Sequence, residues 1–136
     1  MLTRNNLLLV LSFFITTTIS CSRFSGNFGY KTETMDTYRL LKNGMEFESG
    51  QHVDWVYNIE KSGTGIDVGV VVLQKKAVWI DIESRNMKVG LENSRIYGEF
   101  QGQQPGEYRI VLIVKNKIVD ETGYTIYSDN ELDLDE

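Results

Sequence analysis

The stretch that decides the fold is VDWVYNIEKSGTGIDVGVVVL, residues 53–73. Its first part alternates apolar with mostly polar side chains, and this period of two predicts a β-strand with one apolar face. The alternating apolar residues are Val53, Trp55, Tyr57 and Ile59. A loop of turn-forming residues, KSGTG (61–65), leads into the β-branched run Ile66–Leu73. That run predicts a central strand covered on both faces, where Gly69 marks a bulge or a close approach.

Strand signals continue on both sides of this stretch. Asn43-Gly44, between two short apolar alternations, favours a type I′ hairpin because both turn positions need positive φ. Lys115–Lys117 is short enough for a second tight hairpin. The remaining predicted strands are 77–83, a weak edge strand within 84–94, 95–100, 106–114 and 118–127. No window has a helical period, so seven or eight short strands predict an all-β, antiparallel β-sandwich.

The chain divides into four predicted segments. Residues 1–20 resemble a cleavable export signal, with Arg4 before a nine-residue apolar run that is too short to span a bilayer. Residues 21–35 are polar and weakly patterned, which favours a tether. The β-sandwich is expected over 36–128, and 129–136 is an acidic tail expected to be solvated.

Cys21 is the only cysteine of the chain, and it directly follows the predicted signal. The tetrad Thr18-Ile19-Ser20-Cys21 resembles the lipobox of bacterial lipoproteins, although Thr18 departs from the usual leucine. The resemblance implies a lipidated Cys21, and Ser22 at the next position then favours the outer membrane. An ordinary signal peptidase could cut the same residues and leave a secreted protein without a lipid. No intramolecular disulfide and no multi-cysteine zinc site is possible.

Two blocks, residues 53–73 and YGEFQGQQPGEYRIVLIVKNKIVDETGYTIY (97–127), are together similar to the GOLD domain. That domain is an Ig-like β-sandwich of Golgi cargo and lipid-trafficking proteins. Trp55 would match its core aromatics, and Gly106-x-Tyr108 would match the start of its aliphatic strand. Lys115-Asn116 departs from the Asp-Asn that GOLD domains usually carry. The resemblance implies an Ig-like architecture and an interaction module, without indicating a ligand.

The charge of the chain excludes some classes of partner. Arg4 is the only charged residue among the first 20, so the remainder carries 13 of the 14 basic residues against all 19 acids. Nucleic-acid binding needs a basic face, and adhesion to anionic lipid needs basic clusters. We therefore expect no nucleic-acid partner, and a lipid on Cys21 is the expected link to a membrane.

Two pairs of polar residues suggest catalytic chemistry. His52 and Asp54 share one face of a strand and could orient a base, but no nucleophile motif accompanies them. Asp81 and Glu83 have the spacing of glycosidase carboxylates, which any two strand residues at i and i+2 also have. Surface polarity explains both pairs more simply, so we predict no enzyme activity.

Two other groups suggest binding. Trp79 and Tyr97 are candidate ligand contacts if they face solvent, since exposed aromatics bind sugars and proteins. Alternating acids in the tail could gather a hard cation, but they lack the spacing of a calcium loop; these acids are Asp129, Glu131, Asp133 and Asp135.

The sequence thus predicts a lipoprotein of the cell envelope, anchored through Cys21, whose β-sandwich binds a protein or glycan partner without a cofactor. A small carbohydrate-active enzyme using Asp81 and Glu83 is one alternative. A secreted subunit of a larger complex, without a lipid, is the other.

Overall fold

The structure is a computed structural model that describes residues 24–63, 65–90, 93–100 and 102–128. Within these ranges the chain forms nine strands and no helix. The strands are β1 (Ser25–Thr32), β2 (Arg39–Leu40), β3 (Met45–Glu48), β4 (Val53–Lys61), β5 (Ile66–Lys75), β6 (Trp79–Val89), β7 (Arg95–Glu99), β8 (Gly106–Val114) and β9 (Lys117–Tyr127). No helix of the described ranges is long and apolar enough to cross a membrane.

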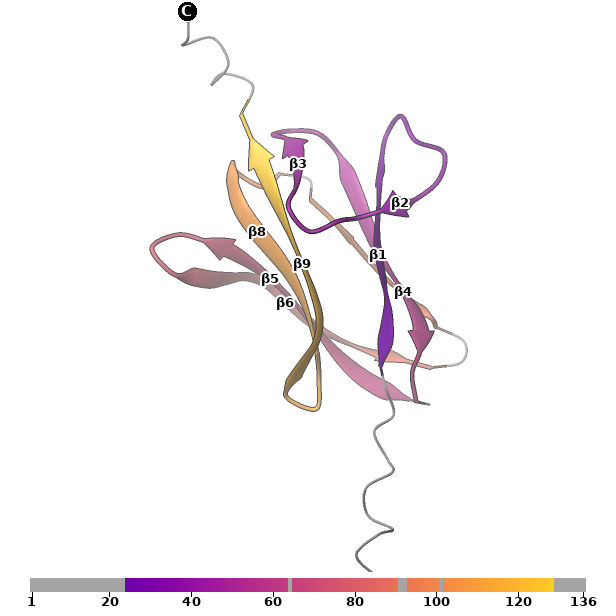
Figure 1. The fold of residues 1–136 in the computed structure, drawn as a ribbon. Coiled ribbons are helices and arrows are strands. Elements are labelled where there is room, and N and C mark those ends of the chain that lie inside the picture. Colours follow the sequence, from indigo (N-terminus) through magenta and orange to yellow (C-terminus); the bar gives the residue numbers. More distant parts are fainter. Residues whose placement is uncertain (1–23, 64, 91–92, 101, 129–136) are drawn as a thin grey trace, which may run out of the picture.

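The strands form two sheets that lie face to face (Figure 1). The four-stranded sheet has the order β2-β1-β4-β7, and the five-stranded sheet has the order β3-β9-β8-β5-β6. The prediction of an all-β sandwich is therefore confirmed. One pairing departs from the predicted antiparallel pattern, because β3 runs parallel to β9.

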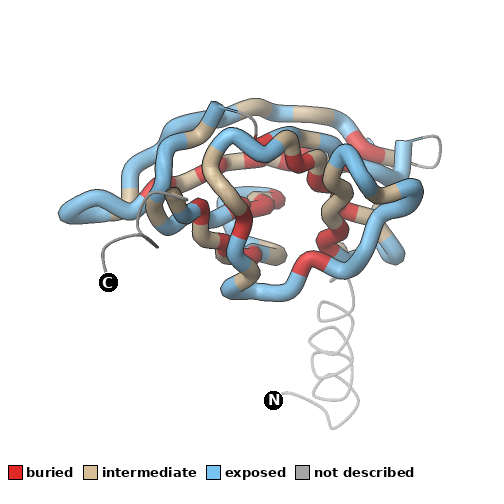
Figure 2. The backbone as a smooth tube through the Cα atoms, turned by 90° about the horizontal axis from the view of Figure 1, so that it is seen from above, coloured by how far each residue is buried: buried red, intermediate tan, exposed pale blue. Residues whose placement is uncertain are grey.

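The core lies between the sheets, where the buried positions of both layers meet (Figure 2). The alternation of β4 places Trp55 and Tyr57 in this core, both at most 1% exposed. On β5 the buried residues alternate with half-buried ones, so only one face of this strand enters the core. The prediction that β5 is covered on both faces was wrong, because the described residues form two layers only and the outer side of β5 is half-buried or exposed.

Neighbouring strands in the sequence often lie in different sheets of this β-sandwich. The chain crosses between the sheets at β2–β3, β3–β4, β4–β5, β6–β7 and β7–β8. Tyr108, near the start of β8, donates its hydroxyl hydrogen to the carbonyl of Gln104, four residues upstream. The Gln74 side-chain amide donates to the same hydroxyl oxygen at 3.1 Å. This is the tyrosine corner of Ig-like sandwiches.

The N-terminal boundary of the domain differs from the predicted one. Residues Ser25–Thr32, which we expected in the tether, form β1 and pair along their whole length with β4. Phe28 is buried and contacts the ring of Tyr57 edge-on, with the ring centroids 4.7 Å apart. Phe28 is the only large side chain of β1 that is fully buried, and glycines and polar residues make up most of the rest of the strand, so its period of two is weak in the sequence.

Asn43-Gly44 was also predicted wrongly as a type I′ hairpin turn. Of the two residues only Gly44 has positive φ, at 84°, and the strands on either side belong to different sheets. The turn instead carries the chain across the sandwich. It is fixed on β9, where the Gly123 N–H donates to the Asn43 side-chain oxygen at 2.7 Å and the Gly44 N–H donates to the Gly123 carbonyl at 2.8 Å.

The second tight turn behaves as the sequence predicted. Lys115 and Asn116 have φ values of 51° and 62°, and they join β8 to β9 as a two-residue hairpin. Two consecutive positive φ values are the mark of a type I′ turn.

The region 77–94 holds one long edge strand where we predicted two shorter ones. β6 runs without a break through Trp79–Val89 and pairs with β5 over its length. Its register against β5 shifts between Val72 and Leu73, whereas the predicted bulge position, Gly69, lies in regular pairing. The shift leaves one extra residue, Ile82, on the β6 side of the ladder.

Candidate ligand-binding face

The candidate site lies on the outer face of the four-stranded sheet. Cross-strand pairing aligns Gly29 of β1, Val56 of β4 and Tyr97 of β7 in one row. Val56 is only 1% exposed although it belongs to the outer face, and the segment with Tyr38 and Arg39 lies close to its partner Gly29. Gly29 permits this close approach, since a Cβ there would lie 3.1 Å from the Val56 side chain and 3.2 Å from the Arg39 carbonyl.

Tyr38 and Tyr97 form an exposed aromatic pair above this row. Their ring centroids are 6.5 Å apart with planes inclined by 52°, and the residues are 37% and 48% exposed. Beside them is an open hollow of about 480 Å³. Its lining residues are Tyr38, Asp54, Glu83, Arg85, Tyr97, Gly98 and Glu99.

The hollow has an acidic rim on one side. Asp54 and Glu99 are direct partners on β4 and β7, one row away from Tyr97. His52 precedes β4, and its Nε2 lies 3.0 Å from Oδ1 of Asp54. Burial raises the pKa of the Tyr38 hydroxyl, and the charge of Asp54 raises it further. Tyr38 therefore presents a protonated hydroxyl to this rim.

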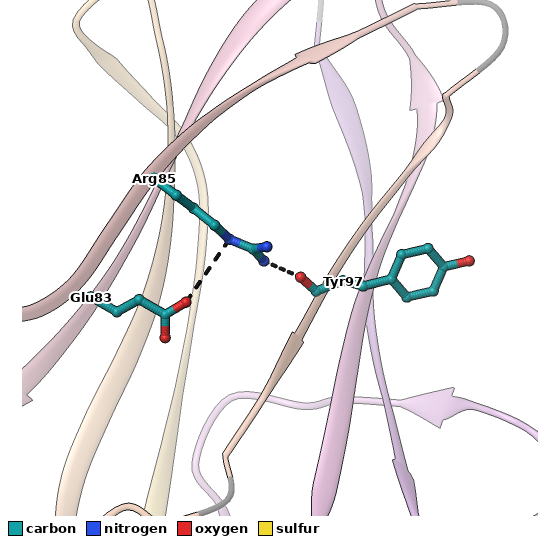
Figure 3. A network of polar contacts seen from close by, with 3 residues as sticks. All are labelled: Glu83, Arg85 and Tyr97. Carbon is teal, nitrogen blue, oxygen red and sulfur yellow. Dashed lines mark hydrogen bonds and ion pairs between the residues drawn. The ribbon is translucent and has the colours of Figure 1, made fainter.

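Arg85 of β6 closes the gap between the edges of the two sheets (Figure 3). Its Nη2 donates a hydrogen bond to the backbone carbonyl of Tyr97, and its Nε lies 3.9 Å from the carboxylate of Glu83. The ring of Tyr97 points away from this contact, toward the outer face (Figure 3). Arg85 thus fixes the backbone of Tyr97 and leaves its side chain available.

The inner side of the same edge is held by Trp55. The Arg85 guanidinium carbon lies 5.8 Å from the centroid of the Trp55 ring. Trp55 covers its cross-strand partner Gly98 so closely that a Cβ on Gly98 would lie 2.3 Å from the indole. The β7 edge that carries Tyr97 and Glu99 is therefore supported from the core, which makes the outer face a rigid platform.

The two predicted aromatic contacts do not come together. Trp79 pairs with Lys75 on the outer face of the five-stranded sheet, so it lies on the side of the sandwich opposite to Tyr97. The guanidinium of Arg109 lies 4.4 Å from the Trp79 ring centroid and covers one face of the ring. The hollow beside Trp79 is smaller, about 250 Å³, and the ion pair of Lys75 with Glu107, 3.1 Å, lies at its margin.

Asp81 and Glu83 are separated by the irregular register of β6. Asp81 pairs with Leu73 and Glu83 pairs with Val72, which are consecutive residues on β5 and therefore face opposite sides of the sheet. Glu83 lines the hollow beside Arg85, and Asp81 does not. The carboxylate pair that the glycosidase alternative requires is thus not formed on one face.

The other predicted residues divide into two groups. His52 and Asp54 lie together as predicted. Cys21 and the tail acids Asp129, Glu131, Asp133 and Asp135 lie outside the described residues. Tyr38, Glu99 and Arg85 were not selected from the sequence, because only the cross-strand register and the gap between the sheets bring them to Tyr97.

The fold and this face define the chain as a nine-stranded β-sandwich with an exposed aromatic and acidic patch on one sheet. No known family model matches the chain, and a comparison with curated proteins finds no similar protein.

Proposed function

We propose that this protein is an exported lipoprotein, anchored through Cys21, whose β-sandwich is a non-catalytic module that binds a glycan. The binding surface is the outer face of the four-stranded sheet. The observation that carries the proposal is the exposed Tyr38–Tyr97 pair beside the hollow of about 480 Å³.

The chemistry of the face suits a sugar. An aromatic side chain can cover the apolar C–H face of a sugar ring without a hydrogen bond. Nearby polar groups then fix the orientation of the sugar. Tyr38 and Tyr97 supply the rings, and carboxylates beside them accept hydrogen bonds from hydroxyl groups. Hydrogen bonds to a charged group of this kind are stronger than those between neutral groups.

The charge of the rim indicates which sugars fit. Asp54, Glu83 and Glu99 line the hollow against one arginine, Arg85, which already contacts Glu83 and the Tyr97 carbonyl. Like charges across an interface disfavour a partner. We therefore expect neutral or amino sugars to bind, and sulfated or uronic-acid polymers to be excluded.

The position of the module in the cell rests on the signal and Cys21. A lipidated cysteine with several acyl chains holds a protein on a membrane without help from its surface charge, at about 0.8 kcal/mol for each buried CH₂. The acidic remainder of this chain, with 13 basic and 19 acidic residues, supplies no such attraction to anionic lipid.

Metabolic labelling with palmitate tests the anchor. In a bacterial host the native chain should incorporate label and sediment with membranes, and Cys21→Ala should lose both properties because no other cysteine is present. Separation of the inner and outer membranes then tests the prediction that the lipoprotein lies in the outer membrane, which rests on Ser22 at the position after Cys21. A soluble, unlabelled native protein that has lost residues 1–20 would show the secreted alternative.

Binding of the mature chain to a glycan array tests the outer face of the four-stranded sheet. All proteins carry Cys21→Ser, so that no lipid is attached and they remain soluble. Tyr97→Ala should weaken binding at least tenfold, about 1.4 kcal/mol, because a central aromatic contact commonly contributes 1 kcal/mol or more. Tyr127→Ala is the matched control, since Tyr127 is as exposed as Tyr38 but does not line the hollow. Binding that is insensitive to Tyr97→Ala and lost in Trp79→Ala would place the site on the opposite face.

A further inference from the structure

We infer that His52, Asp54 and Glu99 form a binding site for a divalent transition metal ion, for which zinc is the expected ion. The site shares Asp54 and Glu99 with the acidic rim of the hollow, but the Tyr38–Tyr97 pair that carries the glycan proposal supplies none of its ligands, so either proposal can fail without the other. Among the residues that the structure describes, these three bring one ligand atom each to within 4.8 Å of the other two.

The backbone holds the three residues in a fixed arrangement. His52 directly precedes β4 and Asp54 is the second residue of that strand, and their side chains meet with Nε2 of His52 3.0 Å from Oδ1 of Asp54. Glu99 at the end of β7 is the direct partner of Asp54. Between them the Phe100 N–H donates to the Val53 carbonyl at 2.8 Å. Two of the three ligands, Asp54 and Glu99, therefore lie on paired strands, which hold ligands more accurately than loops do.

The distances require only small side-chain movements to close around an ion. Zinc binds histidine nitrogen at about 2.0–2.1 Å and carboxylate oxygen at about 2.0–2.2 Å, so its tetrahedral ligands lie roughly 3.4 Å apart. The His52 nitrogen and the Asp54 oxygen are already 3.0 Å apart. The Glu99 carboxylate is exposed, so it can rotate toward the other two without disturbing the core.

The charges around the site also favour a cation. Two carboxylates directly opposite each other on neighbouring strands repel and destabilise the sheet. Lys31 of β1 is the other cross-strand partner of Asp54, but its Nζ lies 6.0 Å from the centroid of the Tyr38 ring. One lysine thus faces two carboxylates, and a divalent ion would remove the excess negative charge.

The ligand types distinguish zinc from harder ions. An imidazole nitrogen with carboxylate oxygens suits zinc and its neighbours in the first transition row, whereas calcium and magnesium take oxygen ligands throughout. Three protein ligands leave a fourth position open. Asp54 and Glu99 also line the hollow beside Tyr97, so that position would be accessible to a donor atom of a molecule bound there.

Isothermal titration of chelator-treated mature protein with zinc chloride tests the site. The native chain should bind one equivalent. His52→Ala, Asp54→Asn and Glu99→Gln should each weaken the affinity at least tenfold, and Asp81→Asn, an exposed acid on the opposite sheet, should leave it unchanged. Circular dichroism of each variant establishes that it is folded, and Tyr97→Ala should retain zinc binding even where it abolishes glycan binding.

A second measurement follows the imidazole directly. His52 is the only histidine of the chain, so its ring resonances can be assigned without ambiguity by nuclear magnetic resonance. One equivalent of zinc should shift them, and cobalt in its place should broaden or displace them. Titration without a shift, or zinc binding that survives all three substitutions, would overturn the proposal. Tight calcium binding that is unaffected by His52→Ala would also overturn the proposal, because the ion would then be bound by oxygen ligands without the imidazole of His52.

Discussion

Replacing Trp55 with alanine is expected to lower the free energy of unfolding by about 3–5 kcal/mol, the usual cost of removing a buried tryptophan. Trp55 is 1% exposed, and its ring meets Phe28 with the centroids 6.3 Å apart. It also fills the space over Gly98, which has no side chain of its own to occupy a cavity there. Domains of this size are stable by about 5–15 kcal/mol, so the loss removes a large part of the stability.

Denaturant unfolding, followed by far-ultraviolet circular dichroism, measures this effect. Trp79→Ala is the matched control because it removes the same side chain from the outer face of the other sheet, where Trp79 is only partly buried against Arg109. We expect the control to cost about 1 kcal/mol or less. Equal losses from the two substitutions would contradict the assignment of Trp55 to the core.

The domain is expected to lose stability steeply above about pH 10. Burial raises the pKa of Tyr57 well above its usual value, and its hydrogen bond to Asp120, 2.8 Å, raises the pKa further. Burial likewise raises the pKa of Tyr124, against the opposing effect of its 2.6 Å hydrogen bond to Gln103. Both hydroxyls therefore keep their protons in the folded state at pH values where the unfolded chain releases them.

The sign of the effect follows from these two raised pKa values. Stability from the bound protons is fully present below the unfolded value, about 10, and is lost as the pH rises from there toward the folded values. Each tyrosine contributes a slope of about 1.4 kcal/mol per pH unit in this window. Tyr57 and Tyr124 together should thus lower the free energy of unfolding by about 3 kcal/mol per pH unit.

Denaturant unfolding at a series of pH values above neutrality measures this slope. Tyr57→Phe serves as the control, because it removes one of these hydroxyls and should reduce the slope by about 1.4 kcal/mol per pH unit. Tyr127→Phe replaces an exposed tyrosine and should leave it unchanged. A free energy of unfolding that stays constant between pH 9 and pH 11, or a slope insensitive to Tyr57→Phe, would show that these hydroxyls titrate equally in both states.

The fold was predictable where a strand has one regular apolar face. The period of two located β4 and β8, and the β-branched run located β5, because the core side of each strand is filled mainly by apolar residues. Prediction failed at β1, which has few buried residues, and at Asn43-Gly44, whose turn signal carries no information about which strand lies next. A local signal specifies the turn, but contacts with Gly123, 80 residues away from Asn43, decide where the chain goes.

The candidate site was predictable only in part. Tyr97 and the pair His52–Asp54 could be selected because an aromatic or a histidine on a strand is conspicuous by itself. Tyr38 and Glu99 could not, since an exposed tyrosine and an exposed glutamate are ordinary surface residues until the register places them beside Tyr97 and Asp54. The bulge in β6 could not be predicted either, and it separates Asp81 from Glu83.

By itself the sequence determined the fold class and the main core strands, because burial of alternate side chains is a local property of each strand. It also carried the segment that we propose as an export signal and Cys21, and their proposed roles depend on linear order alone. Only the tertiary structure decided the parallel pairing of β3 with β9 and the gathering of Tyr38, Tyr97 and the carboxylates on one face. These features depend on which strands become neighbours and in what register, and that is set by contacts between distant parts of the chain.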